Sequence, residues 1–180
     1  MSINNKDILL DFDEDIVLPF TNEWKKTYSF VVRKIEEHEK DCKQLISKLN
    51  KMLNTIIKNG EAYEDIVLKV TMLYFLVKNT AENIEDLEKE YSSTIITNIK
   101  ILLDDSSSKE LDEIFLNKNY AYLNKIKLVE FIYMLKEINN EELVNKVKIL
   151  AKIDNVIKNY KTKTHKKLMK ILIETRNKIN

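Results

Sequence analysis

The sequence predicts an all-α protein, built as a single compact bundle of seven to eight helices, and two observations carry this prediction. First, the 180 residues contain one Gly and one Pro, where average usage would give roughly 12 Gly and roughly 9 Pro. Second, apolar residues recur every three or four positions along most of the chain, which is typical of amphipathic helices. Because hairpin turns and Gly-rich phosphate or dinucleotide loops need Gly at defined positions, the scarcity also argues against most all-β folds and against those sites.

The expected helices follow from this spacing and from capping residues. The first begins at Thr21 or Asn22, either of which can cap it, and runs to about Lys40. The second carries apolar residues between positions 45 and 57 and ends at Gly60, which suits a left-handed C-terminal cap. The further helices are expected over residues 62–77, 84–103, 109–116 and 122–138, from 139 onward, and over 163–179.

Residues 1–20 form an acidic N-terminal arm, which leaves 21–180 as one all-helical domain. The arm has five acidic residues against Lys6, a net charge of −4, and Pro19 ends it. Apolar residues lie between the acids, so the arm either packs on the body or a partner, or is a loosely docked terminus. The clearest polar break, residues 104–108, predicts a loop because Asp and Ser favour turns.

The chain has no features of an exported or membrane-spanning protein. No apolar run approaches the ~20 residues that a membrane-spanning helix needs. The first residues lack the basic and apolar regions of a secretory signal, and the single cysteine, Cys42, excludes an internal disulfide. These observations predict an intracellular, cytoplasmic protein.

Metal-ligating and nucleophilic side chains are scarce. Neither His38 nor His165 has a second His or a Cys at metal-ligand spacing, so we expect both to be surface residues and expect no metal and no cofactor. Cys42 lies one helical turn from His38, but the pattern lacks the strained turn and oxyanion donors of a nucleophile site. We therefore expect no catalysis from this pair.

Charge is segregated although the net charge is only +1. Residues 151–180 hold nine Lys or Arg against two acids, a net charge of +7. A basic contact surface is expected at Lys161, Lys163, Lys166, Lys167 and Lys170. Such a surface attracts phosphates without reading bases, and only Tyr160 is close enough in sequence to stack on a base. Nucleic acid, an acidic membrane and the acidic arm all match this surface in charge.

Two segments carry a family resemblance. Residues 73–80 read Leu-Tyr-Phe-Leu-Val-Lys-Asn-Thr, residues 84–91 read Ile-Glu-Asp-Leu-Glu-Lys-Glu-Tyr, and a later segment spans residues 126–136. The first two resemble, without gaps, the region around the His-Asp pair of the HD-domain alarmone hydrolases of the RelA/SpoT type. The third resembles that family's Val-Lys-Leu-Ala-Asp-Arg-Leu-His-Asn-Leu-Arg helix. The resemblance covers roughly residues 62–180 and implies an HD-domain-like fold.

The residues at the family's functional positions differ. The family's metal-ligand pair, His-Asp, falls at Tyr74 and Phe75, and its catalytic Glu-Asp pair falls at Lys78 and Asn79. Its last metal-ligand Asp falls at Glu130, the only position that keeps an oxygen ligand, whereas a metal needs several ligands. The resemblance therefore implies a scaffold without its chemistry, in which Tyr74 and Phe75 fill the former metal cavity.

We expect a non-catalytic helical binding protein that acts through a protein partner or a bound ligand. One alternative is a metal-dependent nucleotide phosphohydrolase with an atypical site that includes Lys78, Asn79 and Glu130. Another is a helical adaptor whose basic C-terminal helix contacts nucleic acid or transcription factors. The stretch from Leu128 loosely resembles the helical N-terminal domain of a transcription elongation factor, which favours that adaptor. The sequence leaves the partner and the oligomeric state open.

Overall fold

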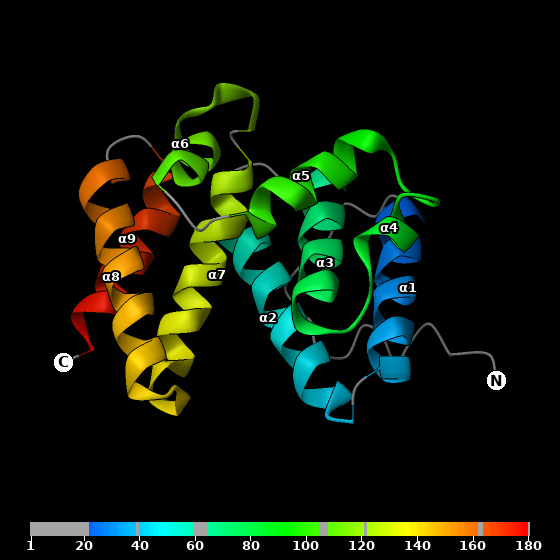
Figure 1. The fold of residues 1–180 in the computed structure, drawn as a ribbon, viewed down its shortest axis with the longest axis horizontal. Helices are drawn as coiled ribbons and strands as arrows, with labels where there is room; N and C mark the ends of the chain where they lie inside the picture. The colour runs from blue at the N-terminus through cyan, green and yellow to red at the C-terminus, as the bar shows by residue number, and fades with distance from the viewer. Residues whose placement is uncertain are drawn as a thin grey trace.

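The computed structural model describes residues 22–38, 40–59, 65–104, 108–120, 122–161 and 164–179. The described residues are helical and contain no strand (Figure 1), which confirms the all-α prediction. Their elements are α1 (Asn22–His38), α2 (Cys42–Asn59), α3 (Asp65–Asn79), α4 (Ile84–Leu87), α5 (Ser93–Leu103), α6 (Ser108–Leu116), a short 3-10 turn (Lys118–Tyr120), α7 (Leu123–Glu137), a second 3-10 turn (Ile138–Asn140), α8 (Leu143–Tyr160) and α9 (Lys166–Asn177).

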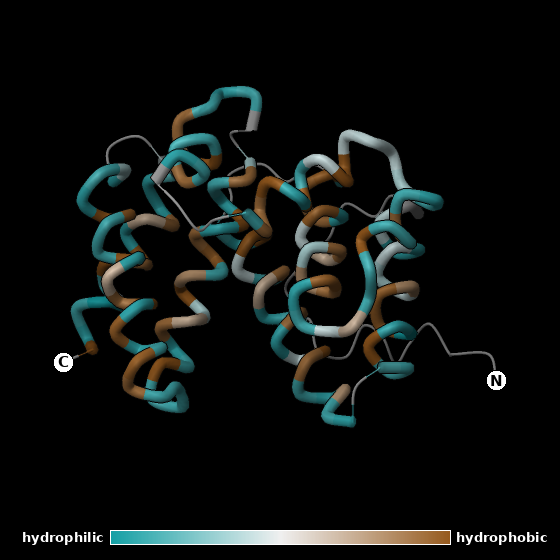
Figure 2. The backbone as a smooth tube through the Cα atoms, in the orientation of Figure 1, coloured by the Kyte–Doolittle hydropathy of each residue, from teal (hydrophilic) through white to brown (hydrophobic). Residues whose placement is uncertain are grey.

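The helices form two groups that meet along α2 and α7. In Figure 1, α1 to α5 lie on one side and α6 to α9 on the other, and α2 and α7 are packed against each other between them. Helices α3 and α7 are buried around most of their circumference, as expected of helices in the centre of a domain. Hydrophobic segments recur along the helices, and the outer turns are mostly hydrophilic (Figure 2). The buried apolar side chains form a cluster that extends from α1 to α9.

The prediction of a single helix over residues 84–103 is wrong, because the structure has two helices there, α4 and α5. Asn83 caps α4, its side chain accepting a hydrogen bond from the backbone N–H of Glu85 at 3.3 Å. Extended backbone at Ser92 interrupts the helix before α5. Leu87 and Ile95 are nevertheless both buried, because the apolar spacing continues across the turn. The described residues therefore hold nine α-helices rather than seven to eight.

The ends of the expected helices differ by a few residues. The first helix ends at His38 rather than at Lys40. The last begins at Lys166, because the His165 ring accepts the backbone N–H of Leu168 at 3.4 Å and so caps α9. His165, expected to be a surface residue, is half-buried in this role.

Several sequence-based predictions concern positions outside the described residues. These are the acidic arm 1–20, the caps at Thr21 and Gly60, most of the loop 104–108, and Lys163. Among the residues that the structure does describe, none of the helices combines the length and the apolar character that a membrane crossing requires.

Candidate functional site

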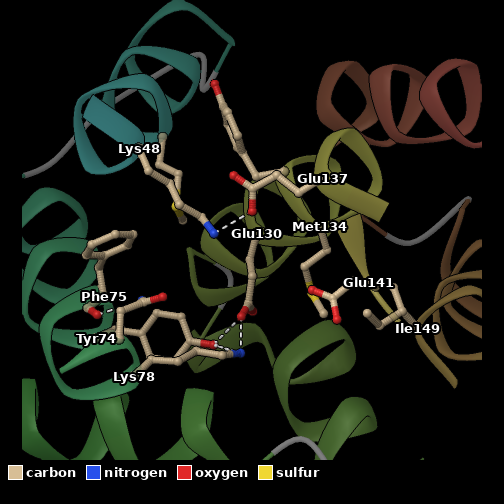
Figure 3. A pocket seen from close by; sticks show the side chains of 12 residues that line it. Lys48, Tyr74, Phe75, Lys78, Glu130, Met134, Glu137, Glu141 and Ile149 are labelled. Atoms are coloured by element: carbon tan, nitrogen blue, oxygen red, sulfur yellow. Dashed lines mark hydrogen bonds and ion pairs between the residues drawn. The ribbon is translucent and has the colours of Figure 1, made fainter. Parts of the chain in front are cut away.

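The structure brings together all five residues that the family resemblance singled out. Tyr74, Phe75, Lys78 and Asn79 come from the last turns of α3, and Glu130 faces them from α7. All five line one cavity of about 190 Å³ (Figure 3). Tyr74 and Phe75 are almost completely buried, and the cavity lies beside them.

The hydroxyl of Tyr74 is the centre of a polar cluster at the inner end of the cavity. It donates a hydrogen bond to Glu130 Oε1 at 2.8 Å and accepts from Lys127 Nζ at 2.9 Å and from Lys78 Nζ at 3.1 Å. A hydroxyl has one donor and two acceptor lone pairs. These three contacts use its full hydrogen-bonding capacity.

Lys127 is buried with no exposed surface. Its ammonium contacts Tyr74 Oη at 2.9 Å, Glu130 Oε2 at 2.7 Å and the backbone carbonyl of Leu102 at 2.9 Å. An ammonium has three N–H donors, so the three acceptors match it. Leu102 lies in the last turn of α5, where carbonyl groups have no partner within the helix and a positive charge is favourable. The charge of Lys127 is therefore well stabilised in the interior.

Two lysines hold the carboxylate of Glu130. Lys78 contacts Oε1 and Lys127 contacts Oε2. Burial by itself would raise the pKa of Glu130, but the charges and hydrogen bonds of Lys127 and Lys78 outweigh burial and lower this pKa below its ordinary value. Glu130 is therefore an anion at neutral pH, already paired with two cations.

These residues do not fit the divalent metal that the family resemblance implies. A cation would have to displace both lysines from Glu130, and neither Phe75 nor Lys78 can serve as a ligand. The side-chain amide of Asn79 donates to the backbone carbonyl of Phe75 at 2.8 Å. In the described part of the chain, no group of three or more His, Cys, Asp or Glu residues is placed to bind a metal ion.

A larger groove of about 990 Å³ lies between α2 and the end of α7, next to this cavity. The residues that line both spaces are Lys48, Asn79, Tyr133, Glu137 and Glu141. Lys48 on α2 and Glu137 on α7 form an ion pair of 2.6 Å across the boundary, as Figure 3 shows. The cavity is thus the inner part of an open, polar groove.

Sequence reasoning missed Lys127, Lys48 and Glu137. The one available signal was Lys127, a lysine three residues before Glu130 in the otherwise apolar middle of α7. The sequence gives no comparable sign of the ion pair between Lys48 and Glu137. Charged residues at such positions of a helix are normally expected to face solvent, and the two lie on separate helices.

The expected basic surface is formed in part. Lys161, Lys166 and Lys170 line a shallow groove of about 420 Å³, together with Met169, Ile173 and Glu174. Lys167 lies apart from that lining and donates to the backbone carbonyl of Lys58 at 3.2 Å. Aromatic side chains are missing from the described lining of this groove, so it offers charge without a stacking platform.

His38 belongs to a structural contact between α1 and the loop after α3. Its Nε2 lies 3.0 Å from Glu82 Oε2, and Lys34 Nζ lies 3.2 Å from the same oxygen. Glu82 is buried, and its carboxylate links the loop after α3 to His38 and Lys34 on α1.

Comparison of the chain with protein-family models, with curated proteins and with solved structures found no match.

Proposed function

We propose that this chain is a non-catalytic binding protein with an HD-domain-like scaffold, which takes a ligand or a segment of a protein partner in the groove between α2 and α7. The observation that carries this proposal is the buried cluster at the inner end of an open groove, in which Glu130 is ion-paired with Lys78 and Lys127. Tyr74 Oη and Glu130 Oε1 are engaged by hydrogen bonds, and Glu130 Oε2 is ion-paired with Lys127. The groove outside the cluster is lined by groups that remain accessible.

The cluster supports a structural role for the residues at the family's catalytic positions. General acid–base catalysis needs a group that can take or give a proton at the reacting atom. The pKa of Glu130 is lowered, which makes it a weak base, and its two oxygens are already ion-paired with Lys78 and Lys127. Lys78, at the position of a catalytic acid, brings a positive charge that opposes a metal.

The experiment that tests this proposal measures hydrolysis of guanosine tetraphosphate by the purified chain with added manganese. We expect no release of pyrophosphate above that of the buffer. Turnover that is lost on Glu130→Gln would overturn the proposal and would establish the alternative, a metal-dependent nucleotide phosphohydrolase with an atypical site.

The adaptor alternative rests on a different observation, the groove lined by Lys161, Lys166 and Lys170. A contact with nucleic acid at this surface predicts an affinity that falls steeply as salt is added. It also predicts that Lys166→Gln/Lys170→Gln weakens the binding of a DNA duplex. Equal binding by this variant and the unmodified chain would exclude α9 as a nucleic-acid contact.

A further inference from the structure

The inner cavity has one wall that is free of charged groups. Met52 from α2, Phe75 from α3, Met134 from α7 and Ile149 from α8 form this apolar wall, and Figure 3 shows Met134 and Ile149 opposite Phe75. The cavity measures about 190 Å³, and an engineered apolar cavity of about 150 Å³ can hold a benzene ring. Because methionine side chains adapt to an irregular apolar guest, the wall suits a single ring or a short alkyl chain.

Glu141 lies where the cavity opens into the larger groove, because it lines both spaces. It follows the 3-10 turn between α7 and α8, and its backbone N–H donates to the carbonyl of Ile138 at 3.3 Å. Figure 3 shows its side chain on the same side of the cavity as Met134 and Ile149. The exposed carboxylate makes no hydrogen bond or ion pair with any residue that the structure describes. It is therefore an anion without a counter-ion at the edge of the apolar wall.

The other charged groups in the described lining of the cavity form ion pairs with one another. Lys48 pairs with Glu137, and Lys78 pairs with Glu130. Lys127 pairs with the same Glu130 from outside the lining, so the inner end has two cations for one carboxylate. An ammonium group would be repelled from the inner end. An anionic group, in turn, would find Lys48 and Lys78 already paired with carboxylates.

We propose that the cavity binds a small organic amine, with its ring or alkyl chain against the apolar wall and its protonated amino group at the carboxylate of Glu141. The position of the free carboxylate at the outer edge sets this orientation, because it places the charge of the ligand away from the inner lysines. Since Glu141 is exposed, its ion pair contributes little, and burial of the apolar part supplies most of the affinity. This inference rests on the proposed function, because it names the class of ligand for the inner part of the same groove.

The test uses the full chain with isotope-labelled methionine methyl groups and phenethylamine as the probe. We expect phenethylamine to shift the methyl signals of Met52 and Met134 in a saturable way. The signals of Met72 and Met169, which do not line the cavity, serve as internal controls and should not move. Phenethyl alcohol has the same ring without a charge, and phenylacetate carries the opposite charge. The affinity should therefore fall from the amine to the alcohol and again from the alcohol to the acid.

Two matched variants separate the charge from the cavity. Glu141→Gln should lower the affinity for phenethylamine about threefold, the effect of one exposed ion pair, and should leave the affinity for phenethyl alcohol unchanged. Glu142→Gln removes the adjacent exposed carboxylate, which does not line the cavity, and should change neither affinity.

Four results would overturn this inference: no shift at Met52 and Met134, equal shifts at all four methyl groups, an alcohol or acid that binds as tightly as the amine, or an equal loss of affinity in both variants. Each would leave the non-catalytic scaffold intact. Hydrolysis of guanosine tetraphosphate, in contrast, would overturn the proposed function whatever the methyl signals show.

Discussion

At the scale of single residues, the buried charges of Glu130 and Lys127 determine what the centre of the molecule can do. A buried ion is costly unless its partners satisfy it. Lys127 meets three acceptors, and Glu130 meets two ammonium groups and one hydroxyl. Besides pairing with each other on α7, these ions contact groups on α3 and α5, so the cluster also links α3, α5 and α7.

Removing the charge of Glu130 tests this role. Glu130→Gln leaves Lys127 buried without its counter-ion, and we expect a loss of about 3–5 kcal/mol in the free energy of unfolding. Glu137→Gln is the matched control, because it breaks the partly exposed pair with Lys48 on the same helix and should cost less than about 1 kcal/mol. Urea unfolding measures both; equal losses would contradict a structural role for the cluster.

The lowered pKa of Glu130 predicts how stability depends on pH. A carboxyl whose pKa is lowered on folding stabilises the folded state above its ordinary pKa of 4.5, and this contribution is lost as the pH falls through the lowered value. The stability difference between the unmodified chain and Glu130→Gln should therefore shrink as the pH drops below 4.5. Unfolding curves measured at a series of pH values check this, and a difference that grows in acid would refute it.

The sequence predicts some of these residues and misses others for a physical reason. Tyr74 and Glu130 were identified through the family resemblance, and the structure places them in contact. Lys127 was not identified, because a charged residue in a helical pattern is normally expected to face solvent. Its burial depends on acceptors in α3 and α5, and pairwise contacts between distant helices cannot be derived from periodicity alone.

At the scale of elements, apolar spacing predicts which side of a helix is buried better than it predicts where the helix is continuous. The buried apolar residues between positions 84 and 103 continue from α4 into α5, although the helix itself is interrupted between them. The break depends on local capping by Asn83 and on the extended backbone at Ser92. Short-range polar contacts of this kind compete with the helix and leave no trace in the hydrophobic period.

Helix α8 begins with an apolar stripe that faces solvent. Leu143, Val144 and Val147 are 76%, 63% and 59% exposed. Exposed apolar patches often mark contacts with other proteins, and this stripe supports the predicted protein partner.

Substitutions on α8 separate the stripe from the core. Because the stripe makes little contact within the chain, Leu143→Ser/Val147→Ser should change the free energy of unfolding by less than about 0.5 kcal/mol per site. Ile153→Ala, at a fully buried position on the same helix, should cost about 2–5 kcal/mol. Thermal or urea unfolding distinguishes the two; a large loss in the double variant would mean that the stripe is buried in the folded chain.

At the scale of the whole molecule, the groove arises where the two groups of helices meet. The all-helical class followed from composition and period, but the groove did not, because its walls are the outer sides of α2 and α7 and depend on how these helices pack. The inner end of the groove is closed by Glu130 and its lysines, and the outer part is open. This arrangement supports binding without metal-dependent chemistry.

The most direct test of that central claim is a manganese titration of the full chain, followed by the electron paramagnetic resonance signal of the free ion. Because Lys78 and Lys127 already hold Glu130, we predict that the unmodified chain and Glu130→Gln leave the same amount of manganese free. One manganese ion bound per unmodified chain, and released by Glu130→Gln, would contradict the account.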